Sequence, residues 1–143
     1  MKSLSTRTAK ASCLIGAALL LGGIAHAARA DCDASATQTD LNLCTGAKVE
    51  AADAELNALY KQIGARLKDD PATAKRMVAA QRAWIAFGDA ECDFESAGVA
   101  GGSIEPMIHG ECLIQLTEVR SADFRRFLAC EEGDLSCPVP PAN

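Results

Sequence analysis

The sequence predicts an all-α fold, a small antiparallel three-helix bundle stapled by disulfides. Three segments carry apolar residues at the three- and four-residue spacing of a helix, and nothing alternates in the strand period for more than three residues. Short turn signals separate the segments, and short connections make consecutive helices antiparallel neighbours. An even set of cysteines downstream of a secretory leader supplies the cross-links.

The first helix is predicted to begin at Thr37 or Thr39, either of which can cap it, and to reach Lys68. Its apolar stripe has helical spacing and consists of Val49, Ala52, Leu56, Leu59, Ile63 and Leu67. Pro71 ends this helix, because the residue before a proline disfavours the α region. The same proline suits the first turn of the next helix.

The second helix is predicted from about Pro71 to Ser96, and the rest of the bundle is organised around it. It contains the only tryptophan of the chain. One of its faces repeats at helical spacing through Met77, Gln81, Trp84, Gly88 and Cys92. We therefore expect that face to be buried against the other helices.

The third helix follows a glycine-containing break at residues 98–102. Ser103 is predicted to be its N-cap, with Glu105 and Pro106 in its first turn, and the helix continues to about Ala129. Its apolar residues share two overlapping faces and are Ile108, Cys112, Leu113, Leu116, Val119, Phe124 and Phe127.

The chain divides into three parts. Residues 1–30 have a basic start and a short apolar core, the pattern of a secretory signal peptide, with cleavage favoured after Ala30 over Ala27. The apolar core is too short for a stable membrane anchor, so we expect a periplasmic or secreted product. Residues 31–130 form the helical domain, and residues 131–143 form a tail rich in proline with one cysteine.

The exported part is strongly acidic. After removal of residues 1–30, 10 basic and 19 acidic side chains remain, which gives a net charge of −9. Such a charge disfavours nucleic acid and anionic membranes as partners and suits a basic protein partner.

Six cysteines remain after the leader, and no two of them form a Cys-x-x-Cys step. A zinc or thioredoxin-type redox site is therefore not expected, and the set indicates disulfides in an oxidising compartment. When the second and third helices are aligned antiparallel about the turn between them, Cys92 and Cys112 lie about 4.5 Å apart along the helix axis. The favoured pairs are Cys32–Cys44, Cys92–Cys112 and Cys130–Cys137, and the main alternatives cross-pair the first four cysteines.

The same alignment of the helices places four polar residues at one height along the bundle axis, namely Tyr60, Gln81, Arg82 and Arg120. A buried arginine needs partners, because breaking a buried ion pair costs about 3–5 kcal/mol. We interpret these residues as a structural polar layer between the helices, and the alternative is an exposed binding layer.

Catalytic chemistry has little support in the sequence. His109 is the only histidine after the leader, and the acidic run that contains Glu91 and Glu95 is typical of a solvated helix face. No phosphate loop, dinucleotide fingerprint or metal-ligand spacing is present. We expect a protein that is not an enzyme and that uses no cofactor or metal.

Several sequence blocks occur together in a fixed order. They are Thr37-Gln38, Leu41-Asn42-x-Cys44, Ala52-Asp53-x-Glu55-Leu56-Asn57-x-x-Tyr60, Ala80-Gln81-Arg82-Ala83-Trp84 with Asp89-Ala90-Glu91-Cys92, Gly101-Gly102-Ser103-Ile104 with Cys112, and Leu116-Thr117-x-x-Arg120. Over roughly Cys32 to Leu128 the chain resembles the LprI-type lysozyme-inhibitor domain, a family of small exported bacterial proteins. It departs from the family at Gly88, where an arginine is usual.

The resemblance implies a helical, disulfide-bonded domain that binds and inhibits a host lysozyme. A glycosidase cleft carries two carboxylates, so an inserted segment should bring hydrogen-bond donors. The turn Gly101–Ser103 is our candidate, through the Ser103 hydroxyl and the backbone amides of Gly101 and Gly102, with His109 as a second candidate. The structural alternative is a tight turn capped by Ser103. The alternative function is a periplasmic scaffold or accessory module without lysozyme binding.

Overall fold

The computed structural model describes residues 32 and 36–142 of the chain. These residues form three long helices, α1 (Gln38–Arg66), α2 (Pro71–Ser96) and α3 (Glu105–Leu128), with a short 3-10 helix η1 (Ala97–Val99) after α2. No strand occurs among them, so the all-α prediction is confirmed. The predicted signal peptide, residues 1–30, lies outside the described residues.

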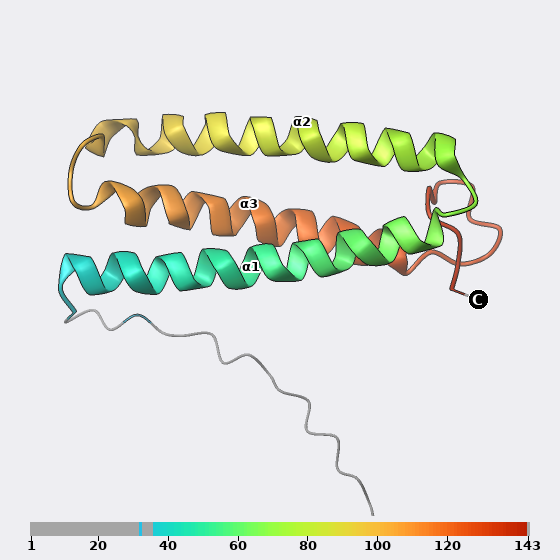
Figure 1. Cartoon of the computed structure of the whole chain (residues 1–143), viewed down its shortest axis with the longest axis horizontal. Coiled ribbons are helices and arrows are strands. Elements are labelled where there is room, and N and C mark those ends of the chain that lie inside the picture. The colour runs from blue at the N-terminus through green and yellow to red at the C-terminus, as the bar shows by residue number, and fades with distance from the viewer. Residues whose placement is uncertain (1–31, 33–35, 143) are drawn as a thin grey trace, which may run out of the picture.

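Helix α3 is the central helix of the bundle. Both α1 and α2 pack along it, α2 antiparallel and α1 parallel to it, and it lies between them in Figure 1. The α1–α2 turn lies at one end of the bundle, together with the C-terminal tail. The turn that contains η1 lies at the other end.

Side chains cap the starts of α1 and α2, and Thr37 is one of the two caps predicted for α1. Thr37 and Asp40 form a capping box at α1, and the Asp70 carboxylate accepts a hydrogen bond from the backbone N–H of Thr73 at 3.0 Å. Asp70 therefore caps α2, directly before Pro71.

The prediction that Ser103 is the N-cap of α3 is wrong. The helix begins at Glu105, and the N-cap position is Ile104, which makes no side-chain capping bond. The Ser103 carbonyl instead accepts a hydrogen bond from Asn42 Nδ2 of α1 at 2.9 Å. This tertiary contact holds the residues before α3 in a turn.

The three disulfides have the favoured connectivity. Cys32–Cys44, Cys92–Cys112 and Cys130–Cys137 have Cα–Cα distances of 5.9, 5.5 and 5.8 Å, which are normal for a disulfide. The second of them joins α2 to α3 and is buried. The alignment of the antiparallel helices α2 and α3 thus predicted the Cys92–Cys112 bond, which joins these two helices.

The apolar core is concentrated at the end with the α1–α2 turn. Its fully buried members are Leu56, Ile63, Leu67, Phe124 and Val139. Met77 and Trp84 from the predicted inner face of α2 pack against this cluster and are half-buried. Gly88 and Cys92, farther along the same face, are buried.

The C-terminal tail belongs to the fold. Val139 is only 3% exposed and completes the core cluster. The Arg66 guanidinium donates to the Leu128 carbonyl at 2.8 Å and to the Pro140 carbonyl at 3.4 Å, which ties the end of α1 to the end of α3 and to the tail. The tail therefore closes the apolar end of the bundle.

We predict that Val139→Ala lowers the free energy of unfolding by roughly 2 kcal/mol, because it removes two buried carbon groups and leaves a cavity. Leu135→Ala in the same tail is the matched control. Leu135 is 101% exposed, so its truncation should change stability by less than about 0.5 kcal/mol. Urea unfolding followed by circular dichroism measures both, and equal effects would contradict a structured tail.

The capping carboxylates make stability depend on pH. The backbone N–H of Thr73 holds the pKa of Asp70 below its usual value, and the Thr37 hydroxyl does the same for Asp40. A lowered folded-state pKa adds stability that is complete above the unfolded-state pKa of about 3.9. That stability is lost as pH falls through the folded-state pKa.

We predict that Asp70→Ala lowers the melting temperature at pH 7 and that the difference from the wild type closes as pH falls below about 4. Asp69→Ala, one residue before the cap, is the control and should show no such closing. Thermal melts between pH 2 and 7 test this. A difference for Asp70→Ala that stays constant down to pH 2 would show that the carboxylate does not act as the cap.

Candidate functional site

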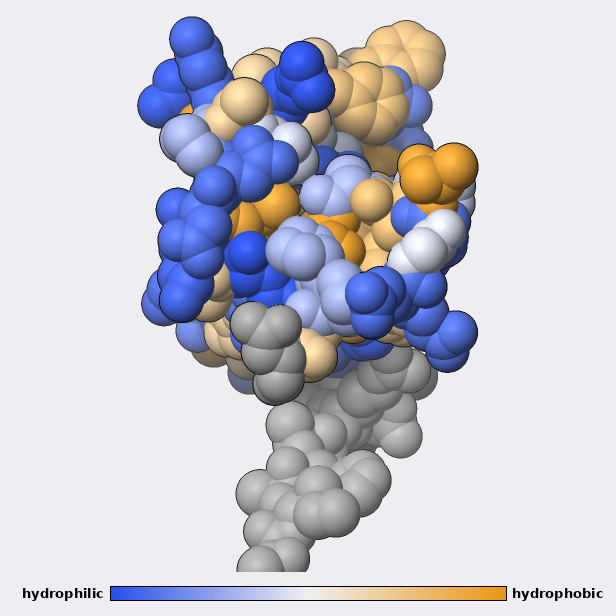
Figure 2. All heavy atoms as spheres, turned by 90° about the vertical axis from the view of Figure 1, so that its right-hand side faces the viewer, coloured by the Kyte–Doolittle hydropathy of each residue, from blue (hydrophilic) through white to orange (hydrophobic). Residues whose placement is uncertain are grey.

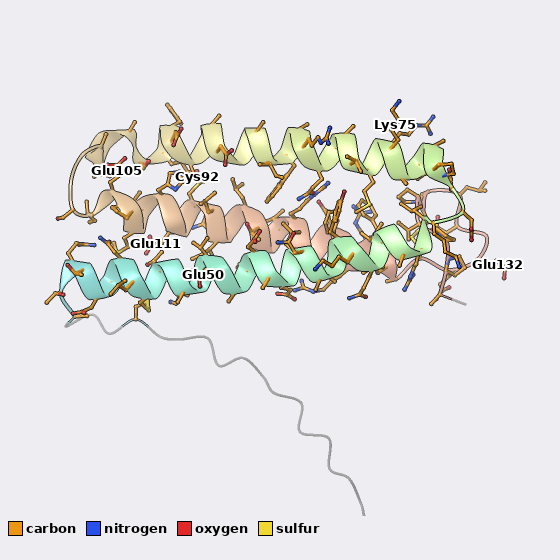
Figure 3. All side chains as sticks on the ribbon, viewed as in Figure 1. Glu50, Lys75, Cys92, Glu105, Glu111 and Glu132 are labelled. Atoms are coloured by element: carbon orange, nitrogen blue, oxygen red, sulfur yellow. A yellow bond between two sulfur atoms is a disulfide. The ribbon has the colours of Figure 1, made fainter. Side chains whose placement is uncertain are left out.

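Charge is distributed unevenly along the bundle. Residues 38–52 and 84–116, which we call the acidic half, contain eight acidic residues and one basic residue, Lys48. Residues 53–83 and 117–142 contain nine acidic and nine basic residues, so the net charge of −7 belongs to the acidic half. Figure 3 shows Glu50, Glu105 and Glu111 in this half.

The η1–α3 turn closes the acidic half. Gly101 has φ +75°, a conformation that favours glycine, and its backbone N–H donates to the Glu105 carboxylate. The Gly102 N–H donates to the Val99 carbonyl at 2.9 Å, and the Glu105 N–H donates to the Gly102 carbonyl at 3.2 Å. The turn is therefore held by its own hydrogen bonds.

These bonds correct one part of the sequence-based hypothesis. The amides of Gly101 and Gly102 were expected to face a partner, but both are occupied inside the turn. The carboxylate of Glu105 is likewise directed to Gly101. Ser103 is exposed at the same turn, and its carbonyl accepts the bond from Asn42. Because the Gly101 and Gly102 amides are occupied, the Ser103 hydroxyl is the remaining donor among those predicted at this turn.

His109 lies at the same end of the bundle and joins α3 to α2. Its Nε2 is 3.3 Å from Asp93 Oδ1. It also lines an open groove of about 480 Å³ between α1 and α3, whose other lining residues are Asn42, Gly46, Val49, Glu50, Glu105, Pro106, Gly110 and Leu113. The structure thus places the Ser103 turn and His109 in one region, with Asn42 touching the turn and lining the groove.

Helices α1 and α3 approach closely at this groove. A Cβ atom on Gly110 would lie 2.7 Å from Thr45 Cγ2 and 3.4 Å from Val49 Cγ2. Thr45 is buried, so the absence of a side chain at Gly110 sets the spacing of the two helices. Sequence reasoning missed both Gly110 and Asn42, and the only signal for the former was a glycine inside a predicted helix.

The predicted polar layer is present in part. Arg120 Nε donates to Gln81 Oε1 at 3.1 Å, and the guanidinium lies 4.6 Å from the centre of the Phe124 ring. Burial lowers the pKa of Arg120, and Asp123 opposes that shift. The Tyr60 ring centre lies 6.2 Å from that of Phe124. Arg82 is exposed, so its placement in this layer is wrong, because its position on α2 faces away from α3.

The acidic run of α2 is largely solvated. Asp89, Asp93 and Glu95 are exposed, and Glu91 is half-buried. Within residues 32 and 36–142, no group of three or more histidine, cysteine or acidic residues has an arrangement that would hold a metal ion. None of the described helices combines the length and apolarity needed to cross a bilayer.

The fold, its disulfides and its acidic half together define a small, acidic, disulfide-bonded helical domain. The family model described as "Lysozyme inhibitor LprI" matches residues 24–124, and the chain belongs to this family. It is 36% identical over 114 residues to an uncharacterised protein of Rhizobium meliloti (strain 1021), an alignment that covers 72% of this chain and 82% of that protein. No solved structure matches the chain.

We predict that Gly110→Ala destabilises the protein by about 1–3 kcal/mol, because the new methyl group overlaps the buried Thr45 side chain. Gly64→Ala is the matched control. Gly64 is an exposed helical glycine, and apart from its chain neighbours and the backbone of its own helix no atom lies within 4 Å of the new Cβ, so this change should stabilise the protein by about 0.4–1 kcal/mol. Urea unfolding measures both, and a gain at Gly110 would contradict the close approach of α1 and α3.

Proposed function

We propose that this protein is exported, binds a basic lysozyme through the acidic half of the bundle, and inhibits it. The observation that carries the proposal is the concentration of a net charge of −7 around the η1–α3 turn, while the rest of the described chain is balanced. A single-sign surface steers an oppositely charged partner and orients it as it approaches. Membership of the LprI family supports a lysozyme as that partner.

The turn supports insertion into the glycosidase cleft. A cleft with two catalytic carboxylates repels other carboxylates and accepts hydrogen bonds from donors. Glu105 is bound to the Gly101 amide, which leaves the Ser103 hydroxyl as the donor at the turn. We assign Ser103 to the cleft, the surrounding acidic side chains to the basic rim, and His109 in the adjacent groove to a second contact.

The disulfides and the N-terminal pattern support export of the protein. Three disulfides form and persist in oxidising compartments, and residues 1–30 have the pattern of a signal peptide. We place the processed protein in the periplasm or outside the cell. The competing function is an envelope scaffold or accessory module, in which the acidic surface serves solubility alone.

The test is an inhibition assay with protein expressed with its own leader and purified after export. We predict dose-dependent inhibition of one lysozyme class among the chicken, invertebrate and goose types. Inhibition should weaken when salt is raised from about 0.01 to 0.15 M, because the Debye length falls from about 30 to 8 Å. If no class is inhibited, the scaffold function takes the place of this proposal.

Two charge-reversal variants locate the binding surface. Glu50→Lys with Glu95→Lys changes two exposed residues of the acidic half and should raise the inhibitory constant at least about tenfold. Glu131→Lys with Glu132→Lys makes the same change of net charge at two exposed residues of the tail and should leave it nearly unchanged. Equal losses in both would show that net charge alone matters.

Ser103→Trp tests the cleft contact separately. The side chain at this position is exposed, so the change should leave the fold intact and block entry of the turn into the cleft. Gly102 is a poor site for such a variant, since a Cβ there would lie 2.9 Å from the Val99 carbonyl oxygen and distort the turn. Full inhibition by a folded Ser103→Trp variant would exclude insertion of this turn.

A further inference from the structure

Helix α2 has an apolar face that no other described element covers. We call it the outer face of α2, and it consists of Ala79, Ala80, Ala83, Ala86, Phe87, Ala90 and Phe94. All seven residues are exposed, Phe87 to 53% and Phe94 to 76%. Figure 2 views the bundle end-on, and apolar side chains stand at its upper edge, where α2 lies.

The outer face lies opposite the packed face of the helix. Gly88 and Cys92 are buried towards α3, and positions such as Ala83 and Ala90 lie roughly half a turn away from them. Phe87 and Phe94 are seven residues apart, so they stand two turns apart on one side of the outer face. Two aligned, exposed aromatic rings beside a flat alanine surface form a patch typical of a protein contact.

The basic and acidic residues of α2 lie in separate halves of the helix. Residues 71–83 contain Lys75, Arg76 and Arg82 and no acidic residue, whereas residues 84–96 contain four acidic residues and no basic one. The amine of Lys75 points away from the other two helices in Figure 3. A helix with this pattern is complementary to a second copy of itself when the two run antiparallel, and it repels itself when they run parallel.

We propose that two copies of this protein associate through the outer faces of α2, antiparallel about a two-fold axis. The two-fold axis places the basic half of each helix beside the acidic half of the other, so this contact between opposite charges forms twice. The proposal goes beyond lysozyme binding and does not depend on it. The occupant of the face is a second copy of this chain, because the charge pattern of α2 is complementary to itself.

Side-chain sizes fix a register for the pair. When Ala83 of one copy lies beside the partner's Ala86, Phe87 lies against the partner's Ala80 and Ala83, so that a large residue faces small ones. The alanines also let the two helices approach closely.

The same register brings opposite charges together. Arg82 then lies within about 3 Å, along the axis, of the level of the partner's Asp89. Phe94 lies within about 1.5 Å, along the axis, of the level of the partner's Arg76, where a cation–π contact can form. Each of these contacts occurs twice in the dimer.

The size of the face sets the expected strength. The 26 residues of α2 span about 39 Å, and a single helix pair of this length buries less than the roughly 1,600 Å² of a standard interface. We therefore expect a reversible dimer with a dissociation constant in the micromolar range or weaker. The two η1–α3 turns lie at opposite ends of such a dimer and stay accessible.

Sedimentation velocity without lysozyme tests the proposal, using protein purified after export over about 1 µM to 1 mM. We expect a monomer–dimer equilibrium that weakens as salt is raised. Arg82→Asp and Asp89→Arg should each raise the dissociation constant at least about tenfold, because each places like charges together twice. The double variant restores opposite charges and should return the constant to within about threefold of the wild type.

Lys61→Asp is the matched control, since it makes the same charge change as Arg82→Asp at an exposed site on α1 and should leave the dissociation constant unchanged. Circular dichroism confirms that each variant is folded. A protein that stays monomeric up to 1 mM, a dimer that tolerates both single changes, or a double variant that fails to recover would each overturn the proposal.

Discussion

The buried disulfide between Cys92 and Cys112 is the constraint on which the acidic half of the bundle depends. The large buried apolar side chains lie at the opposite end, in the cluster that contains Phe124 and Val139. The cross-link joins α2 to α3 over a sequence separation of 20 residues, a loop whose closure stabilises the folded state by about 3 kcal/mol in the chain-entropy model. Cross-linking thus replaces a large apolar core where the charge is concentrated.

This division explains how one end of a small domain can carry a net charge of −7. Like charges on neighbouring helices destabilise the compact state by mutual repulsion. The Cys92–Cys112 bond and the close approach at Gly110 hold α2 and α1 against α3 despite that repulsion. A concentrated acidic surface has a cost in stability, which is consistent with a role in binding a basic partner.

Much of the fold could be predicted from the sequence, because helical periodicity and proline positions are local signals. The bounds of α2 match the prediction, and the Cys92–Cys112 pair followed from the levels of two antiparallel helices. Gln81 and Arg120 were also expected to meet, and they do. The prediction failed at Arg82, because this position of α2 is rotated to the exposed side of the helix.

The candidate site was harder to predict, because its geometry depends on contacts between distant residues. Asn42 reaches the Ser103 carbonyl across 61 positions of the sequence, and no local pattern encodes that bond. The occupied amides of the turn depend on the direction of the Glu105 side chain. Val139 is a single apolar residue among prolines, so periodicity could not place it in the core.

The two proposed interactions use different parts of the acidic half. Pairing of α2 would place the acidic run around Asp89 beside the basic start of the partner's helix and neutralise part of it. Glu50 and Glu111 lie on α1 and α3, away from the outer face of α2, and remain exposed to a basic partner. A dimer would therefore concentrate the uncompensated negative charge near the η1–α3 turns, the part of the surface assigned to lysozyme.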